Sequence, residues 1–457
     1  MILFKNLEKF KDNIFFIENN TKKYYKDFFK FEKKFIDLKS RKLALLASNN
    51  SSEFLQIYLT FLRKDIVIML IDYNTNQNTI NKIIDAYKPF YIFFKKEKFK
   101  SLKNYKITHN LEENVIYERK TRISYQIFDN LSLLLSTSGS TGSQKFVRVS
   151  KKNLISNTKN ICKYLQIKKN HRTITTLPPN YTYGLSILNT HIFMGASICL
   201  NKSSVMEKNF WKTSNKYKIN NFGGVPFHFE ILKKLKFSKK KIKSLQYITQ
   251  AGGHLEKKTK KYFANDAKKN NYKFIVMYGQ VEATSRISYL PFEKLEDKFE
   301  SVGISIAEGK INIHPETHEI IYEGPNVTLG YAFSFRDLKK GDENNGKINT
   351  GDLGKFDSDG YLKIFGRKNR DIKIFGHRIN LDEIENILKN KGFDCPCIGE
   401  DNKLIIFLKK NNNQTNISNY LRKKLKINSK IFKFIKIREY PLNTSGKISY
   451  PSLRKLI

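Results

Sequence analysis

Two uninterrupted apolar runs on either side of a helix-like segment constrain the fold of this chain most. Residues 43–50 (LALLASNN) and 66–74 (IVIMLIDYN) are apolar without alternation and run into polar residues, as strands buried on both faces do. Residues 52–63 (SEFLQIYLTFLR), which lie between them, repeat apolar side chains at helical spacing. This strand–helix–strand order predicts parallel strands and an α/β domain.

Length and composition set the outer limits. The 457 residues allow roughly two to four domains and a core that needs neither disulfides nor a metal. Hydrophobic residues make up 40% of the chain and aromatic residues 13%, which excludes a wholly disordered protein.

The cysteines and the N-terminus indicate the compartment. The four cysteines form no CxxC pair and are too few for a disulfide scaffold, so we expect reduced thiols. No secretory signal is visible, and the longest apolar runs, such as residues 66–71, are far shorter than the ~20 residues of a membrane helix. The sequence therefore predicts a soluble, cytoplasmic protein with no membrane span.

The formal net charge of +42 favours nucleic-acid binding at first sight, because Lys and Arg neutralise phosphates. The lysines, however, are spread along the chain, and Asn, Ile, Phe and Tyr are abundant as well. A codon bias toward A and T explains all these excesses together. We expect no specific nucleic-acid partner, and weak adhesion to RNA or anionic lipid only as a side effect of the positive field.

The C-terminal part has the pattern of a small α+β module. Residues 403–410 and 432–437 resemble strands, with a short helix (SNYLRKKL) between them. The segment LDEIENIL predicts a helix that begins after Asn380 as its N-cap. We expect a large N-terminal α/β domain over residues 1–368 and a small C-terminal α+β domain over residues 369–457.

The most informative motif follows the apolar run Leu133–Leu135. Glycines allow positive φ, so that successive N–H groups point into one concavity and hold an anion, while hydroxyls and a lysine add donors and charge. The alternative is a Ser/Gly-rich surface linker, but a linker has no reason to stand between two strand-like segments. We therefore predict a phosphate-binding loop formed by Thr137, Ser138, Gly139, Ser140, Thr141, Gly142 and Lys145.

A second motif, YGQVE, is weaker. Tyr278 and Gly279 follow the strand-like FIVM, at the end of a strand, where ligands of α/β proteins gather. An aromatic ring there stacks on a base, and the Glu282 carboxylate offers oxygen ligands to Mg²⁺. The alternative for Tyr278 is ordinary core packing.

Two further candidate sites lie in the C-terminal quarter of the chain. Asp352 offers acceptors to ribose hydroxyls, with Arg367 as a nearby donor. The alternative for this pair is a hairpin that turns at residues 357–360, with a salt bridge across it. Lys447 follows a turn and is, taken alone, one lysine among many.

In their order these motifs resemble those of the adenylate-forming superfamily, which includes acyl-CoA synthetases, adenylation domains of peptide synthetases and luciferases. The resemblance runs from about Leu131 to the end of the chain, with a weaker echo upstream. The segments that carry it are TSGSTGSQK, YGQVE, NTGDL, GRKNRDIKIFGHRINLDEIE and PLNTSGK.

The resemblance implies an AMP-binding ligase that uses ATP and Mg²⁺ in two half-reactions. A carboxylic acid first attacks the α-phosphate of ATP, which gives acyl-AMP and pyrophosphate. A thiol, from CoA or a separate acyl-carrier protein, then takes the acyl group. The large domain is expected to carry a small mobile lid.

The resemblance also implies roles for single residues. Thr137–Lys145 holds the β- and γ-phosphates. Lys447 is the catalytic lysine of adenylation, and Glu282 binds Mg²⁺. The other expected contacts are Tyr278 and Gly279 at the adenine, Gly252 and Gly253 beside it, Asp352 and Arg367 at the ribose, and Asn369 at the hinge.

Four positions depart from the family pattern: Gln144 replaces a common Pro, Phe146 a common Gly, Asn369 an Asp or Lys at the hinge, and Val281 a Thr. The first three are tolerable in a loop or turn. Val281 stands where the family has a threonine whose hydroxyl contacts phosphate, and valine cannot donate that bond. Thr284, three residues on, is a weak candidate to replace it. These departures keep open a weakened, nucleotide-binding homologue, and the charge keeps open a basic protein that adheres to nucleic acid.

The acid is the open question. Amino-acid-activating members carry an Asp in the region of residues 180–192, but no acidic residue occurs between Thr173 and Val205. A buried ammonium without a partner is costly, so we expect no ordinary α-amino acid. Tyr183, Gly184 and His191 are expected to line a mostly apolar acyl pocket, with plain core packing as the alternative.

Overall fold

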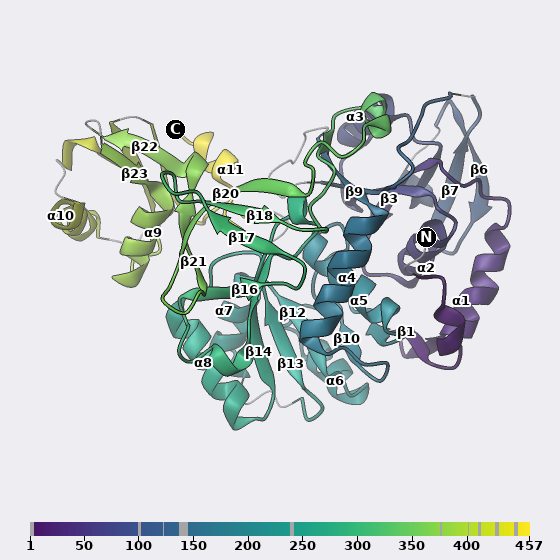
Figure 1. Ribbon diagram of the computed structural model, residues 1–457, viewed down its shortest axis with the longest axis horizontal. Coiled ribbons are helices and arrows are strands. Elements are labelled where there is room, and N and C mark those ends of the chain that lie inside the picture. Colours follow the sequence, from purple (N-terminus) through teal and green to yellow (C-terminus); the bar gives the residue numbers. More distant parts are fainter. Residues whose placement is uncertain are drawn as a thin grey trace. The chain divides into compact units, whose positions relative to one another are not determined.

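A computed structural model describes residues 4–98, 102–121, 123–136, 145–237, 242–374, 377–400, 402–409, 413–425, 429–442 and 447–457. The chain forms two compact units (Figure 1). Unit 1 contains residues 1–310 and 322–348, and unit 2 contains residues 311–321 and 349–457. The predicted domain boundary at residue 369 is defined by a hinge, and the division into compact units does not test it, so it stays a prediction.

The strand–helix–strand unit is confirmed. Strand β3 (Leu43–Ser48), helix α2 (Ser52–Arg63) and strand β4 (Val67–Asp72) follow one another, and β3 pairs with β4 in parallel. They belong to an eight-stranded sheet in unit 1. Its order is β19 (Tyr331–Ala332), β9 (Phe146–Ser150), β8 (Leu131–Ser136), β4, β3, β5 (Tyr91–Lys95), β7 (Asn114–Arg119) and β6 (Tyr105–Asn110).

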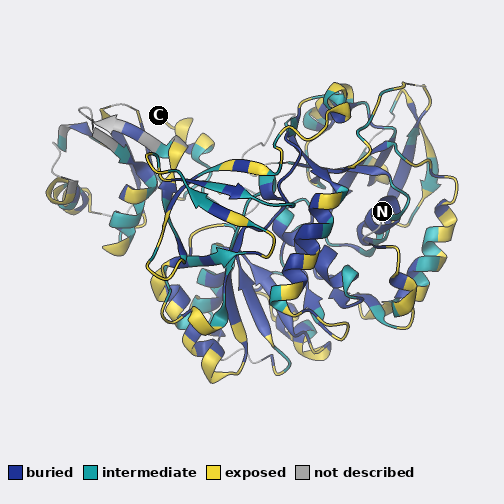
Figure 2. Cartoon of the chain, viewed as in Figure 1, coloured by how far each residue is buried: buried dark blue, intermediate teal, exposed yellow. Residues whose placement is uncertain are grey.

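A second sheet in unit 1 is parallel from β1 through β14 apart from its edge strand β2, and antiparallel beyond β14. Its order is β16 (Ser301–Ser305), β15 (Ser288–Leu290), β14 (Lys273–Tyr278), β13 (Tyr247–Gln250), β12 (Asn221–Gly224), β10 (Arg172–Ile174), β11 (Ser197–Cys199), β1 (Ile14–Glu18) and β2 (Thr21–Tyr24). Figure 2 shows β12 and β13 buried along their length. Their carboxyl ends lead into the loops that carry the predicted site.

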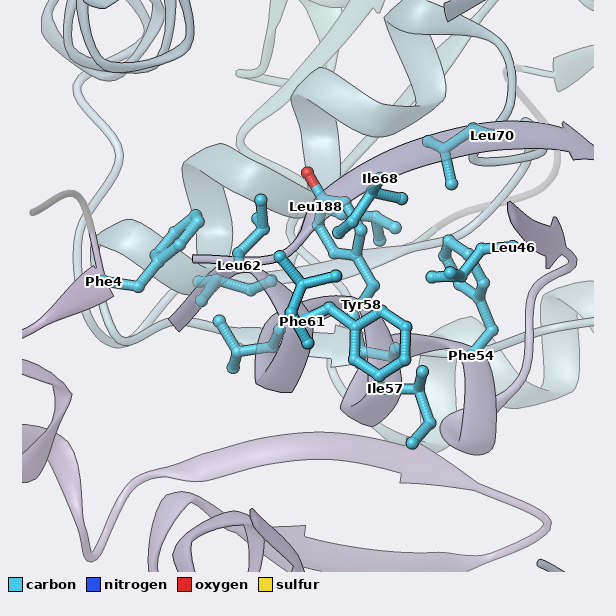
Figure 3. Close-up of a cluster of buried hydrophobic side chains, with 14 of the residues drawn as sticks. Phe4, Leu46, Phe54, Ile57, Tyr58, Phe61, Leu62, Ile68, Leu70 and Leu188 are labelled. Atoms are coloured by element: carbon cyan, nitrogen blue, oxygen red, sulfur yellow. The ribbon is translucent and has the colours of Figure 1, made fainter. Parts of the chain in front are cut away.

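Helices cover these sheets. Those of unit 1 are α1 (Tyr25–Glu32), α2, α3 (Gln77–Tyr87), α4 (Lys151–Leu165), α5 (Thr182–Phe193), α6 (Lys208–Lys216), α7 (Pro226–Lys234) and α8 (Lys257–Lys269). The largest core cluster is built on α2, whose Phe54, Tyr58 and Phe61 lie among side chains of β3, β4 and α5 (Figure 3). No helix in the described part of the chain is long and apolar enough to span a bilayer.

Unit 2 contains the predicted α+β module. Helix α9 (Leu381–Asn390) begins as predicted, because the Asn380 side chain accepts from the backbone N–H groups of Asp382 and Glu383. Three strands have one end in unit 1 and the rest in unit 2: β17 (Lys310–Ile313), β18 (Glu319–Glu323) and β20 (Lys347–Phe356). The other elements of unit 2 are β21 (Leu362–Arg367), β22 (Asp371–Ile374), β23 (His377–Asn380), β24 (Cys397–Glu400), β25 (Lys403–Leu408), α10 (Gln414–Leu425), β26 (Phe432–Lys436) and α11 (Tyr450–Arg454).

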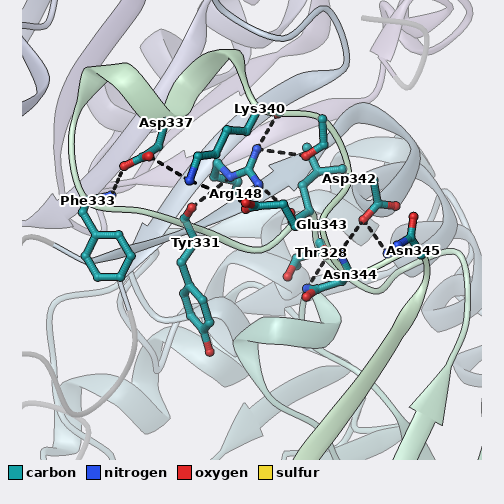
Figure 4. A network of polar contacts seen from close by, with 12 residues as sticks. Arg148, Thr328, Tyr331, Phe333, Asp337, Lys340, Asp342, Glu343, Asn344 and Asn345 are labelled. Carbon is teal, nitrogen blue, oxygen red and sulfur yellow. Dashed lines mark hydrogen bonds and ion pairs between the residues drawn. The ribbon is translucent and has the colours of Figure 1, made fainter.

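One buried arginine ties the 329–343 segment to strand β9 (Figure 4). The side chain of Arg148 is 0% exposed and forms an ion pair with Glu343 at 2.6 Å. Its guanidinium also donates to the carbonyls of Leu329, Tyr331, Lys340 and Gly341. Lys340, Gly341 and Glu343 therefore supply acceptors to a buried cation.

We expect Arg148→Met to lower the free energy of unfolding by about 3–5 kcal/mol, because it leaves a carboxylate and several carbonyls without their donor. Lys340→Met is the matched control. Lys340 pairs with Asp337 and Glu343 at the surface, where solvent screens an ion pair and its loss changes stability little. Chemical denaturation measures both; equal midpoints for Arg148→Met and the parent chain would contradict this account.

Candidate functional site

The predicted phosphate-binding loop joins two paired strands. Strands β8 and β9, which precede and follow this loop in the sequence, are antiparallel, with Ser136 opposite Phe146. Thr137, Ser138, Gly139, Ser140, Thr141 and Gly142 lie outside the described residues. Lys145 is described, and its Nζ lies 3.5 Å from the centroid of the Tyr331 ring.

Tyr331 connects Lys145 to Glu282. The Tyr331 hydroxyl donates to Oε1 of Glu282 at 3.0 Å, and burial raises the pKa of Tyr331, as does the nearby Glu282 carboxylate. The Glu282 backbone carbonyl is held as well, because it accepts from Thr328 N at 2.9 Å and Thr328 Oγ1 at 3.0 Å. Two predicted site residues are thus brought together by a tyrosine that the sequence did not single out.

Glu282 fits a magnesium ligand. Its Oε2 accepts no hydrogen bond from any residue that the structure describes, so a hard carboxylate oxygen is left for a cation. The described residues contain no group of three or more His, Cys, Asp or Glu able to hold a metal. A site with one carboxylate suits Mg²⁺, which is usually held by one or two carboxylates, substrate phosphates and water.

The turn after β14 depends on Gly279. A Cβ at Gly279 would lie 2.0 Å from the Ser285 carbonyl oxygen, so only glycine allows this close approach. The preceding Tyr278 is half-buried at the end of β14. Val281 packs against the core cluster around α2. Thr284 is buried and donates to the Asn326 carbonyl at 2.6 Å, so its hydroxyl is not available to replace the missing donor.

The Gly252–Gly253 turn lies against an aromatic side chain. Gly252 has φ +85°, and a Cβ there would lie 2.2 Å from the Tyr181 hydroxyl. Gln250 donates to the Gly253 carbonyl at 2.9 Å and closes the turn. Glycine at position 252 is therefore required both by backbone conformation and by space.

The predicted acyl-pocket residues separate into two groups. Tyr183 and His191 line a cavity of about 20 Å³ behind α5. Gly184 serves packing instead, because a Cβ there would lie 2.4 Å from the Pro178 carbonyl oxygen. Arg286 and Tyr247 line the same cavity. We did not single them out from the sequence, where one arginine among 84 Lys and Arg gives no signal.

In unit 2, Asp352 and Arg367 face each other across the β20–β21 hairpin. Arg367 Nε donates to Asp352 Oδ1 at 2.9 Å; the Asp352 side chain is 8% exposed and that of Arg367 is 66% exposed. The sequence alternative of a hairpin with a salt bridge is confirmed, and a ribose-binding role stays a prediction. Asn369 lies in the turn Lys368–Arg370, but its side chain is outside the described residues.

Lys447 belongs to the same electrostatic group. The pKa of Lys447 is lowered to about 8, mainly by burial and then by the Arg367 cation, while the Asp352 carboxylate acts in the opposite direction. These causes act over short range, so Lys447 lies close to the Asp352–Arg367 pair. A lysine with this pKa changes its charge near neutral pH.

The chain is similar in sequence to a family of AMP-binding enzymes and to ligases that act with CoA or a carrier protein. The AMP-binding enzyme family matches residues 36–332. Oxalate–CoA ligase from Arabidopsis thaliana is 28% identical over 277 residues, 57% of this chain and about half (52%) of the relative. D-alanine–D-alanyl carrier protein ligase from Lactococcus lactis is 26% identical over 455 residues, 91% of this chain and 89% of the relative.

Solved structures confirm the fold class. The o-succinylbenzoate CoA synthetase of Bacillus subtilis, in complex with its acyl-adenylate intermediate, superimposes with a TM-score of 0.78 at 18% identity, covering 98% of this chain and 97% of that one. The same enzyme has been solved with ATP and a magnesium ion, and that structure superimposes with a TM-score of 0.75 at 20% identity.

We expect the amine of Lys447 to titrate near pH 8. Asp352→Asn should move its pKa below 8 because a carboxylate that favours the charged form is lost, and Arg367→Gln should move it upward because a repelling cation is lost. Modification by an amine-reactive reagent over a range of pH, read by peptide mass spectrometry, measures both shifts. Lys340, whose pKa Asp337 raises, is the internal control. Shifts in the same direction would contradict this electrostatic grouping.

Proposed function

The chain belongs to the family of AMP-binding enzymes, and we propose that it activates a carboxylic acid with ATP as acyl-AMP and then transfers the acyl group to a thiol. The observation that carries the proposal is Lys447, a lysine with a lowered pKa beside the Asp352–Arg367 pair. A cation held there is suited to stabilise negative charge that develops on a carboxylate and an α-phosphate during adenylation.

Residues of unit 1 supply most of the remaining contacts in this proposal. Lys145 and the loop before it bind the β- and γ-phosphates, and Tyr278 stacks on the adenine. Glu282 holds Mg²⁺, which, when bound, neutralises phosphate charge. Tyr331 fixes the Glu282 carboxylate through its hydroxyl and so positions the ligand oxygen. The ribose contacts come from unit 2, where Asp352 and Arg367 hold the ribose hydroxyls.

The acceptor is CoA or the phosphopantetheine of a carrier protein. The two relatives described above are named for these two kinds of acceptor, so the choice between them stays open to experiment. The four cysteines are free and buried, which supports the prediction of a reducing, cytoplasmic compartment.

Exchange of labelled pyrophosphate into ATP tests the proposal, because it reports reversible formation of acyl-AMP for each acid supplied. We expect exchange that depends on both an acid and Mg²⁺. ATP binding without exchange for any acid in a broad panel would favour the alternative of a nucleotide-binding homologue.

Lys447→Ala should slow acyl-AMP formation by about 10²–10³-fold, as loss of a single transition-state donor does, with little change in ATP affinity. Thiol transfer from supplied acyl-AMP should be nearly unchanged, because the lysine acts only on the first half-reaction. Lys455→Ala, an exposed lysine near the C-terminus, is the control. Normal acyl-AMP formation in Lys447→Ala would overturn the assignment, and equal damage to both half-reactions would overturn its restriction to adenylation.

A further inference from the structure

The cavity behind α5 holds three buried polar atoms without partners. Arg286, His191 and Tyr247 line it, and their exposed fractions are 1%, 2% and 6%. Within the described part of the chain, Nε of Arg286, Nε2 of His191 and the Tyr247 hydroxyl make no hydrogen bond. A buried polar atom without a partner costs about 1–3 kcal/mol, and more if charged, so three around one cavity indicate a missing ligand.

The ion pairing of Arg286 differs from that of Arg148 and Arg370. Arg148 pairs with Glu343 and with several carbonyls, and Arg370 pairs with Asp382 and Glu385. Among the described residues no carboxylate forms an ion pair with Arg286. No carboxylate thus balances its charge, whereas Arg148 and Arg370 are neutralised. Arg119, which is 8% exposed, also lacks an ion pair among the described residues, but its Nε donates to the Pro89 carbonyl and to the Tyr105 hydroxyl.

Aromatic rings hold the Arg286 cation in place. Its guanidinium lies 5.0 Å from the centroid of the Tyr183 ring. Burial raises the pKa of Tyr164 to about 12, and the Arg286 charge and a hydrogen bond from Arg286 partly offset that rise. Contact with aromatic faces stabilises a cation by about 0.5–2 kcal/mol and keeps the guanidinium positioned, but it does not neutralise the charge.

The other two atoms complete a polar lining. Nδ1 of His191 donates to the Ile187 carbonyl at 2.8 Å, which leaves a lone pair on Nε2. Burial lowers the pKa of His191 to about 4, and the Ile187 carbonyl and the Asn221 side chain, which also lines the cavity, partly offset this. Tyr247 offers a hydroxyl donor. The cavity of about 20 Å³ has room for about one or two oxygen-sized groups. Water fills such a space and satisfies the ring and the hydroxyl, yet water carries no charge to balance Arg286.

We propose that Arg286, with Tyr247 and His191, binds a second carboxylate of the acid substrate, so that the enzyme selects a dicarboxylic acid. A carboxylate supplies two acceptor oxygens and the negative charge that the guanidinium lacks. The same cation repels the ammonium of an α-amino acid, in agreement with the absence of an acidic residue between Thr173 and Val205. This inference rests on the proposed activation of a carboxylic acid and names its class.

The first test compares straight-chain dicarboxylic acids, from oxalate to adipate, with the monocarboxylic acids of the same chain length in pyrophosphate exchange. The best dicarboxylic acid should exceed its monocarboxylic counterpart in kcat/KM by about 10–100-fold, the effect of one charge-assisted hydrogen bond. If monocarboxylic acids react equally well, the selection by Arg286 is wrong while the proposed function stands. If no acid supports exchange, the proposed function fails.

The second test uses variants. Arg286→Met should abolish the preference for dicarboxylic acids, and Arg286→Lys, which keeps the charge, should retain part of it. Arg172→Met is the matched control, because Arg172 Nε also lacks a partner among the described residues but Arg172 does not line the cavity. An unchanged preference in Arg286→Met would overturn the inference, as would its loss in Arg172→Met alone.

Two readouts do not depend on catalysis. Calorimetric titration with the preferred dicarboxylate should show binding to the parent chain and weaker binding to Arg286→Met. Thermal unfolding of Arg286→Met should have an unchanged or raised midpoint, because an uncompensated buried charge is removed. A fall comparable to that of Arg148→Met would identify Arg286 as a residue that also supports the fold, and the comparison of acids with the parent chain and with Arg286→Lys would then decide the preference.

Discussion

The burial of Arg148 is the interaction on which the unit 1 part of the site depends. A guanidinium with no access to water needs acceptors for its donors, and here the 329–343 segment supplies them. This requirement fixes β19 beside β9. Tyr331 is consequently held where its ring meets Lys145 and its hydroxyl meets Glu282. The β9–β19 pair thus carries both the buried Arg148 network and Tyr331, which contacts the candidate ligand residues.

A similar arrangement organises the C-terminal elements. Arg370 donates to the carboxylates of Asp382 and Glu385 and to the Cys397 carbonyl at 3.0 Å. Its guanidinium lies 3.9 Å from the centroid of the Tyr450 ring. One side chain therefore links α9, β24 and α11, directly after the predicted hinge residue Asn369. Arg370 therefore holds together α9, β24 and α11, the elements that would move as one body in a hinge motion about Asn369.

Arg286, in contrast to Arg148 and Arg370, is buried without an ion pair among the described residues. The paired arginines stabilise the fold, whereas we assign Arg286 to the selection of the acid. Natural proteins retain uncompensated buried charge mainly where a ligand completes it. The relatives have a common fold but are named for different acids. Selectivity for the acid must therefore come from the few side chains that line the acid cavity. In this chain those side chains combine aromatic rings with a cation, and that combination favours an anionic group over an apolar tail.

Much of the architecture could be predicted from local pattern alone. The β3–α2–β4 unit and the Asn380 cap of α9 follow from period and capping chemistry within about ten to thirty residues of sequence, and the ordered motifs identified the family and fold class that the comparisons confirm. The glycine-dependent turn at Gly279 was visible as part of a motif. These features are local because each depends on backbone conformation or on side chains a few positions apart.

Pairing between distant residues was decided only by the tertiary structure. Nothing in the sequence indicates that Arg148 pairs with Glu343 or that Lys145 contacts Tyr331. Nor does it indicate that Arg286 lines a cavity with no carboxylate among its lining residues. In a chain with 84 Lys and Arg, residue type cannot distinguish a solvated cation from a buried one. Burial determines what a charge costs and which partner it needs, and burial is a property of the folded chain rather than of any segment.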